Sequence, residues 1–247
     1  MPRDVVLVTG ASSDIGFALI QRLLARKEKP TVVAHYHTGR SRICELREEL
    51  GPDHIAPVEM DLTKTADFAE VLGRIEAEYG IPNQFVHLPA QKLVYERFSK
   101  FDWCRFHRDL QIQVQSAVLL LRELMPRMAQ LDRARVVFLV SSVTRNMPPK
   151  FLSAYTIVKY AQLGLMRSLA SEYAGTKVTV NAVSPSMVET RFLADVPQVA
   201  VRMSAHQNPK GRNATPDDVV GAIEFLLSEE SSYITGVEIP VTAGSVC

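Results

Sequence analysis

A tyrosine, a lysine and a serine are the residues of this 247-residue sequence whose types and spacing could perform chemistry. Tyr155 and Lys159 stand four positions apart in SAYTIVKYA, so a helix would place both side chains on one face. Ser142 precedes Tyr155 by thirteen positions. A phenol needs roughly 4 kcal/mol of bias to act fully as an acid or base at neutral pH, and a nearby ammonium supplies part of it. Tyr155 could then protonate a carbonyl oxygen that the Ser142 hydroxyl holds, although a solvated helix face explains a lone YxxxK pair as well.

A second candidate feature is the turn in VVLVTGASSDIGFALI. Gly10 follows an apolar run and Gly16 lies just inside the next helical segment, so bare backbone could approach a diphosphate at the start of that helix. Asp14 stands where a further glycine would be expected, and its carboxylate would repel phosphate. If Asp14 caps the helix and turns back onto its amides, the donors near Ser12 and Ile15 stay available. The alternative is a plain corner between a strand and a helix.

The elements that must position these residues follow from the hydrophobic pattern. Short β-branched runs occur at 5–10, 30–36, 55–62, 84–90, 135–142 and 177–185, and segments of helical period lie between them. This alternation predicts a Rossmann-type α/β fold, a doubly wound parallel sheet flanked by helices, in one domain over 1–247.

The segment 186–215 is the one long interruption of this pattern, and we predict that it forms a lid over the substrate. Its apolar residues recur at roughly helical spacing: Phe192, Leu193, Val196, Val199, Val201 and Met203. A lid over an apolar or acyl substrate would need such a stripe, and packing onto the chain's own core would produce the same one. A capped helix at 215–228 and a last strand within 236–244 should follow.

The composition excludes several classes of protein. Lys and Arg number 28 against 27 Asp and Glu, so no overall charge attracts nucleic acid or an acidic membrane surface. Cys44, Cys104 and Cys247 lack metal-ligand or CxxC spacing, which favours a reducing compartment. The sequence has no leader pattern and no apolar run of membrane-spanning length. We therefore expect a cytoplasmic protein without a membrane or nucleic-acid partner.

Taken together, these motifs resemble the short-chain dehydrogenase/reductase family over essentially the whole chain. TGASSDIG resembles the family motif TGxxxGxG, with Asp14 in place of its middle glycine. By the same resemblance, Ser142, Tyr155 and Lys159 match the family's catalytic serine, tyrosine and lysine, and Asp61 in MDLTK matches its adenine-contacting aspartate.

The segment NAVSPSMVET resembles a further family motif. By that resemblance, the backbone of Val188 and the hydroxyl of Thr190 would hold the nicotinamide amide, and Ser186 replaces a glycine. The whole cofactor set implied in this way is Gly10, Ser12, Ser13, Asp14, Ile15, Gly16, His37, Thr38, Arg40, Asp61, Leu62, Pro89, Tyr155, Lys159, Val188 and Thr190.

Two departures from the family pattern bear on catalysis. HLPA, from His87 to Ala90, replaces the family's NNAG, and Pro89 has no amide donor. Gln113 stands where many members have an asparagine that anchors a proton-relay water. Gln113 could hold the same water on its longer arm, or it could slow the resupply of protons.

The segment after the second strand, AHYHTGRSR, contains no acid of the kind that binds ribose hydroxyls in NAD-preferring members. His37, Thr38 and Arg40 would suit a 2′-phosphate instead, so we predict NADP(H). Arg40 and Arg42 could also simply begin a solvated helix, an alternative that carries more weight for Arg42. His35 and His37 lack a third metal-ligand partner at the right spacing, and no metal site is expected.

The resemblance is strongest to 3-oxoacyl carrier-protein reductases. It implies an NADP(H)-dependent ketoreductase that acts on a 3-oxoacyl thioester carried on acyl carrier protein or coenzyme A. Arg127, Arg133, Arg135 and Lys177 are expected to flank the site and could meet an acidic carrier protein there. Two alternatives remain open: a cofactor-binding scaffold or partner subunit without catalysis, and an alcohol dehydrogenase working in the oxidative direction.

The apolar faces of the segments 110–129 and 154–174 exceed what one face of a sheet needs. In the family these helices pack across a two-fold axis, so the resemblance implies a homotetramer or homodimer.

Overall fold

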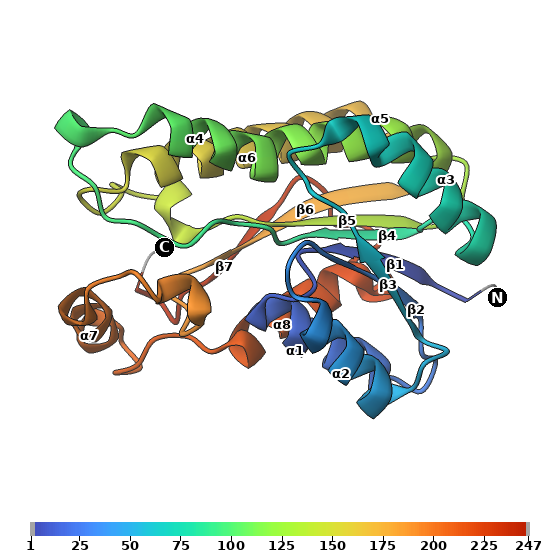
Figure 1. The fold of residues 1–247 in the computed structure, drawn as a ribbon, viewed down its shortest axis with the longest axis horizontal. Helices are drawn as coiled ribbons and strands as arrows, with labels where there is room; N and C mark the ends of the chain where they lie inside the picture. Colours follow the sequence, from blue (N-terminus) through green and yellow to red (C-terminus); the bar gives the residue numbers. More distant parts are fainter. Residues whose placement is uncertain (1–2, 246–247) are drawn as a thin grey trace.

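Within residues 3–245, which the computed structural model describes, the apolar runs of the sequence form seven strands (Figure 1). They are β1 Val5–Thr9, β2 Thr31–Tyr36, β3 Ile55–Glu59, β4 Gln84–His87, β5 Ala134–Leu139, β6 Val178–Pro185 and β7 Glu238–Val241. The strands pair in parallel in the order β3-β2-β1-β4-β5-β6-β7. The predicted doubly wound α/β fold is therefore confirmed. Cys44 and Cys104 are free thiols, and Cys247 lies outside the described residues.

Helices cover both faces of this sheet (Figure 1). One face carries α1 Asp14–Leu24, α2 Arg40–Leu50 and α8 Pro216–Leu227, and the other carries α3 Phe68–Tyr79, α4 Trp103–Leu110, α5 Ser116–Met128 and α6 Ser153–Glu172. The helix α7 Gln198–Gln207 stands apart from both layers. Short 3₁₀ turns occur at η1 Thr65–Asp67, η2 Phe98–Lys100, η4 Ser142–Thr144, η5 Arg191–Leu193 and η6 Glu229–Ser231, and η3 Gln111–Gln115 is a π-helical turn between α4 and α5.

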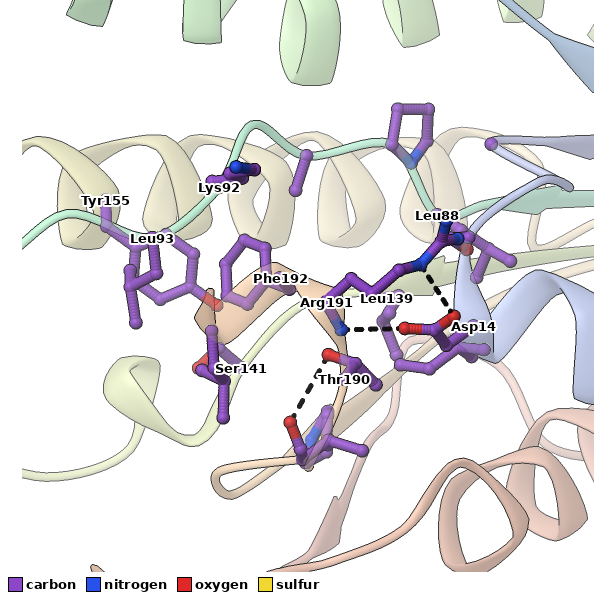
Figure 2. A pocket seen from close by; sticks show the side chains of 18 of the residues that line it. Asp14, Leu88, Lys92, Leu93, Leu139, Ser141, Tyr155, Thr190, Arg191 and Phe192 are labelled. Atoms are coloured by element: carbon purple, nitrogen blue, oxygen red, sulfur yellow. Dashed lines mark hydrogen bonds and ion pairs between the residues drawn. The ribbon is translucent and has the colours of Figure 1, made fainter. Parts of the chain in front are cut away.

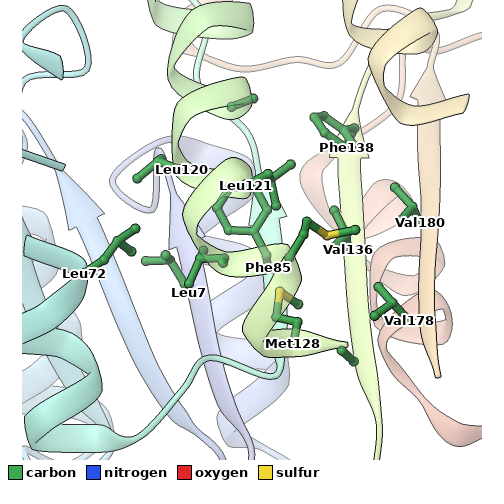
Figure 3. Close-up of a cluster of buried hydrophobic side chains, with 14 of the residues drawn as sticks. Leu7, Leu72, Phe85, Leu120, Leu121, Met128, Val136, Phe138, Val178 and Val180 are labelled. Atoms are coloured by element: carbon green, nitrogen blue, oxygen red, sulfur yellow. The ribbon is translucent and has the colours of Figure 1, made fainter. Parts of the chain in front are cut away.

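Each face of the sheet has its own apolar core. Leu7 and Phe85 point toward α5, where they meet Leu120 and Leu121 (Figure 3). Val6 belongs instead to the core beneath α1 and α8. Burial on both faces explains why these strands appear in the sequence as nearly continuous apolar runs.

The carboxyl edge of the sheet opens into one large cavity. Just beyond the ends of β1 to β6 lie Gly10, His37, Asp61, Leu88, Val140 and Ser186, and all of them line a cavity of about 1090 Å³. The chain leaves β1 toward β2 on one side and returns to β4 on the other, and ligands of such sheets bind at this reversal. The topology therefore places the site where the sequence motifs predict it.

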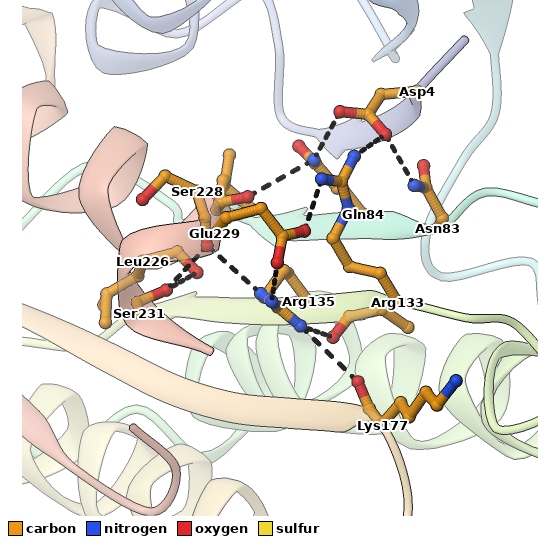
Figure 4. Close-up of polar contacts among 12 residues, drawn as sticks. Asp4, Asn83, Gln84, Arg133, Arg135, Lys177, Leu226, Ser228, Glu229 and Ser231 are labelled. Carbon is orange, nitrogen blue, oxygen red and sulfur yellow. Dashed lines mark hydrogen bonds and ion pairs between the residues drawn. The ribbon is translucent and has the colours of Figure 1, made fainter. Parts of the chain in front are cut away.

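The opposite, amino edge of the sheet holds the basic residues that we assigned to a carrier protein. Arg133 forms ion pairs with Asp4 and Glu229, and buried Arg135 donates to the carbonyl oxygen of Ser228 (Figure 4). Arg127 likewise pairs with Glu76, and Lys177 with Asp132. The assignment was wrong, because these side chains lie at the edge away from the cavity and already have acidic or carbonyl partners.

The excursion that we predict to be a lid, 186–215, leaves the end of β6 and returns to the sheet at α8. Val188 pairs with Ala214, so the two ends of the segment lie together. Leu193 and Val196 are buried with Leu93, whereas Val199 is exposed on α7. A capping box between Thr215 and Asp218 then starts α8 as the sequence predicts. In the part of the chain described, no helix is long and apolar enough to cross a membrane.

Candidate active site

Most of the residues that we assigned to a cofactor line this cavity. They are Gly10, Ser12, Ser13, Asp14, Ile15, His37, Thr38, Asp61, Leu62, Pro89, Tyr155, Lys159, Val188 and Thr190. Gly16 and Arg40 do not line it. The cavity of about 1090 Å³ lies just above the roughly 300–1,000 Å³ typical of ligand pockets, which suits a ligand as large as a dinucleotide.

The backbone of the turn packs so closely against its neighbours that Gly10 and Gly16 leave no room for a side chain. Gly10 has a φ of +73°, and a Cβ added there would meet the backbone nitrogen of Pro89 at 3.0 Å. A Cβ on Gly16 would lie 2.5 Å from the carbonyl oxygen of Ala11. Gly16 therefore lets α1 pack against the turn, and Gly10 alone of the two faces the cavity.

Ser13, and not Asp14, caps α1. The Ser13 hydroxyl accepts a hydrogen bond from the amide of Gly16 at 3.0 Å, and Asp14 is already the first residue of the helix. The expected cap by Asp14 was wrong. Its carboxylate instead accepts hydrogen bonds from Arg42 on α2 and from Arg191 at the start of η5.

The wall beyond β2 also differs from expectation. Arg40, which we assigned to a 2′-phosphate, is exposed and lies off the cavity, whereas Arg42 lines it. The helical phase explains the difference, because α2 begins at Arg40 and only the later residue points back toward the turn. His37 lies 3.8 Å from Asp61, and Asp61 accepts hydrogen bonds from the amide and hydroxyl of Thr63. These hydrogen bonds lower the pKa of Asp61 and keep it ionised.

Tyr155 lies at the far end of the cavity, and its hydroxyl points toward Ser141 (Figure 2). Ser142 lines the cavity as the first residue of η4, but Ser141 is the serine whose side chain reaches the phenol. The structure therefore places Ser141, and not the predicted Ser142, next to the phenol. Burial raises the pKa of Tyr155 to about 12, although the Ser141 hydrogen bond opposes this shift and the charge of Asp109 adds to it.

Lys159 lies on the same face of α6 as Tyr155, and its Nζ is 5.6 Å from the center of the tyrosine ring. The ammonium donates to the carbonyl oxygen of Leu139 at 3.0 Å and to Gln162 Oε1 at 2.9 Å. Burial lowers the pKa of Lys159 to about 7, and the nearby carboxylate of Asp109 partly offsets that loss. Lys159 is thus poised between its two protonation states at neutral pH.

Gln113 is fully buried in the π-helical turn and does not line the cavity. Its side-chain Nε2 donates to Asp109 Oδ1 at 2.8 Å. The backbone carbonyl oxygen of Gln113 accepts hydrogen bonds from His87 Nε2 at 3.0 Å and from Gln162 Nε2 at 3.1 Å. Both lone pairs of that backbone carbonyl are therefore in use, and the Gln162 side chain connects it to Lys159. Among the described residues, the side-chain Oε1 of Gln113 accepts no hydrogen bond, and the two expectations for a relay water stay predictions.

His87 of the HLPA segment ties the sheet to this helix. Its Nε2 faces the Gln113 carbonyl and must donate, so Nδ1 accepts from the Thr9 hydroxyl at 2.8 Å. Burial lowers the pKa of His87 to about 3, which keeps the ring neutral. His35 is engaged in the same manner, since its Nδ1 accepts from the amide of Gly10 and its Nε2 donates to the carbonyl of Met60.

Apolar side chains close the end of the cavity beyond Tyr155. The Phe192 ring lies 5.9 Å from the Tyr155 ring, and Leu93, Val143 and Leu152 pack beside them. The Leu93 amide donates to the Phe192 carbonyl oxygen, which joins the excursion to the loop after β4. An apolar group is the natural occupant of this end.

Sequence reasoning missed Asp109, Ser141, Gln162 and Arg191. Gln162 lies three positions after Lys159, and Asp109 four before Gln113, so helical spacing could have indicated both. No local pattern distinguishes Ser141 from Ser142. Arg191 reaches Asp14 from 177 positions along the chain, a contact that only the tertiary structure shows.

Residues 10–245 match the model of a protein family described as enoyl-(acyl carrier protein) reductase. The chain is 28% identical over 241 residues to an uncharacterized oxidoreductase of Bacillus subtilis, with 98% of each chain covered. It is also 28% identical over 246 residues to the 3-oxoacyl-[acyl-carrier-protein] reductase of Escherichia coli, covering 97% of this chain and 96% of the other. A cis-4-hydroxycyclohexanecarboxylate dehydrogenase of Sinomonas cyclohexanicum is 29% identical over 246 residues, covering 97% and 95%.

Solved structures share the fold at lower identity. A 3-ketoacyl-(acyl-carrier-protein) reductase from Brucella melitensis, in complex with NADH, superposes with a TM-score of 0.87 at 24% identity, with 98% of each chain covered. A short-chain dehydrogenase/reductase from Serratia marcescens gives a TM-score of 0.89 at 22% identity over the whole of both chains.

Proposed function

Because the chain belongs to the short-chain dehydrogenase/reductase family and is an oxidoreductase, we propose that it reduces a ketone with NADPH, and that the ketone is a 3-oxoacyl thioester on acyl carrier protein or coenzyme A. One observation carries this proposal. Tyr155, Ser141 and Lys159 lie together where a cavity long enough for a dinucleotide ends against apolar side chains.

In the proposed reaction, Tyr155 is the acid. The bound nicotinamide would supply hydride to the carbonyl carbon, which is the chemistry that this chain's own side chains lack. Tyr155 gives its phenolic proton to the carbonyl oxygen, and the Ser141 hydroxyl holds that oxygen as negative charge develops on it. Lys159, held by Leu139 and Gln162, faces the phenol and favours the negative charge left on it.

The protonation state of Tyr155 supports reduction over the oxidative alternative. With a pKa of about 12, the phenol is protonated at neutral pH, and reduction begins from the protonated acid. Oxidation of an alcohol begins instead from the phenolate, which burial disfavours here. The clustering of Tyr155, Ser141 and Lys159 likewise supports an active enzyme over a scaffold without catalysis.

The preference for NADPH rests on the wall beyond β2. His37, Thr38 and Ser41 line the cavity there, and the strand ends without the acidic residue that binds ribose hydroxyls. With Arg40 turned away, His37, Thr38 and Ser41 are the donors proposed for the 2′-phosphate.

The acyl substrate is proposed from the apolar end of the cavity, where Phe192, Leu93 and Met187 could contact a short chain. The carrier is proposed from the E. coli relative alone, since the basic residues first assigned to it lie at the opposite edge of the sheet. We further propose that the protein self-associates through α5 and α6, because Val118, Ile157 and Tyr160 on these helices are exposed. A cytoplasmic location is also part of the proposal.

The test is a titration of the purified protein with NADPH and with NADH, followed by turnover of a 3-oxoacyl thioester. We expect tighter binding of NADPH and loss of the ketone. In Tyr155→Phe, turnover should fall by about 10²-fold or more while nucleotide binding stays unchanged, because the aromatic ring remains in place and only the acidic hydroxyl is lost. A fully active Tyr155→Phe variant, or a wild-type protein that binds neither nucleotide, would contradict the proposal.

A further inference from the structure

Asp14, Arg42 and Arg191 line the cavity and form a charged cluster, which we name the Asp14 clasp. Asp14 Oδ2 accepts from the backbone amide of Arg191 at 2.7 Å, and Oδ1 accepts from Arg191 Nε at 3.0 Å and from Arg42 Nη1 at 2.8 Å. The carbonyl oxygen of Ser12 accepts from both guanidinium groups, at 2.8 and 2.9 Å. Figure 2 shows Arg191 reaching across to Asp14 beside Thr190.

The clasp reverses the charge that Asp14 alone would give the turn. Burial would raise the pKa of the Asp14 carboxyl, but the hydrogen bonds and charges of Arg191 and Arg42 outweigh it, so the pKa is lowered and Asp14 is ionised. One carboxylate and two guanidinium groups leave a net charge of +1. Asp14, whose carboxylate alone would repel phosphate, is thus part of a positively charged cluster.

Both arginines keep donors for a ligand. Among residues 3–245, Arg191 Nη1 and the Nε and Nη2 of Arg42 make no hydrogen bond. The Arg42 guanidinium carbon lies 4.7 Å from the center of the Phe17 ring, which fixes its position. Planar guanidinium groups with free, fixed donors are the side chains best suited to phosphate oxygens.

The position of the clasp selects the part of the ligand that it meets. Arg191 follows Thr190 on the wall after β6, and it reaches the turn after β1 on the other wall of the same cavity. Figure 2 shows Arg191 between Tyr155 and Asp14, and Arg42, which shares Asp14 with it, lies at the start of α2 just after His37 and Thr38. A dinucleotide that reaches from His37 to Tyr155 would place its diphosphate, which is its middle part, next to Arg191.

We propose that Arg191 and Arg42 bind the diphosphate of the dinucleotide, and that Asp14 holds the two guanidinium groups in place for it. The inference rests on the proposed function only in taking a dinucleotide as the ligand. It also connects the cofactor to the excursion 186–215, because Arg191 is part of that excursion.

A double-mutant cycle on Asp14 and Arg191 tests the proposal, with NADPH and NADH titrated separately. Arg191→Ala lowers the net charge of the clasp to zero, and we expect its Kd for both nucleotides to rise by the same factor, about tenfold or more. Asp14→Asn combined with Arg191→Ala returns the net charge to +1 but restores neither the Arg191 donors nor the acceptor that holds Arg42, so its Kd should stay at least about threefold above the wild-type value. The effect of Arg191→Ala should shrink at high salt.

Arg22→Ala, which removes a similarly exposed ion pair between α1 and Glu224 of α8 away from the cavity lining, is the matched control and should leave both Kd values unchanged. An unchanged Kd in Arg191→Ala, a loss confined to NADPH, or a double variant that binds both nucleotides as tightly as the wild-type protein would each overturn the proposal. If the wild-type protein binds both nucleotides but reduces no thioester, the proposed function fails while this inference stands.

Discussion

Lys159 donates a hydrogen bond to Gln162 Oε1 over 2.9 Å, one turn further along α6. The other end of the Gln162 amide donates to the backbone of Gln113, so a side chain spans the gap between the ammonium and the π-helical turn. An amide fixes the orientation of its neighbours but does not pass protons as a water does. The protonation of Lys159 therefore depends on the groups that face it.

Gln162→Glu should shift the pH dependence of turnover. A carboxylate beside the ammonium favours the charged form, so the pKa of Lys159 should rise from about 7 and the alkaline limb of kcat should move to higher pH. Gln162→Leu should move that limb to lower pH, because it removes the hydrogen-bond acceptor. A pH profile of kcat for the three proteins measures both shifts, and identical profiles would contradict the role assigned to Gln162.

Asp109→Asn should move the same limb to lower pH. The Asp109 carboxylate raises the pKa of Lys159 against the effect of burial, and asparagine keeps the shape while removing the charge. The groups that face Lys159 are then Tyr155, Gln162 and neutral His87. Nucleotide binding should be retained, since Asp109 does not line the cavity. A profile that does not move would show that Asp109 only positions Gln113.

Ser141→Ala and Ser142→Ala should differ in their effect on turnover. Removing a donor to a developing oxyanion costs about 10²-fold in kcat, and we expect that loss for Ser141→Ala. Ser142→Ala should stay within about threefold of the wild-type rate. Equal losses in the two variants, or a larger loss at Ser142, would return the role to Ser142.

Acid should destabilise the protein through its buried histidines. Burial lowers the pKa of His35 to about 4 and of His87 to about 3, both below the 6.5 of an unfolded chain. Between these values the unfolded chain binds more protons, so the free energy of unfolding falls as the pH falls below 6.5, by about 1.4 kcal/mol per pH unit for each histidine. Denaturant titrations between pH 7 and pH 4.5 should show a smaller fall for His87→Gln than for the wild-type protein.

The fold was predictable because apolar runs and helical periods alternate along the chain, and most of these runs are strands buried on both faces. Tyr155 and Lys159 were predictable as a pair because they share one helix. Arg40 was wrongly assigned to the cavity wall because the residues GRSRICEL do not show where α2 begins. The first residue of the helix decides which of its side chains face the cavity. The partners of Asp14 lie on α2 and at η5, and local propensity carries no information about contacts across such distances.

The π-helical turn η3 gives the long helix from Trp103 to Met128 two registers. Deleting one residue between Gln111 and Gln115 would turn α4 by about 100° relative to α5. Either Asp109 would then leave Gln113 and Lys159, or Leu120 and Leu124 would leave the core. The number of residues in the turn Gln111–Gln115 is therefore as important as their types. An in-frame deletion of one of them would disrupt either the contacts of Asp109 or the packing of α5 on the sheet.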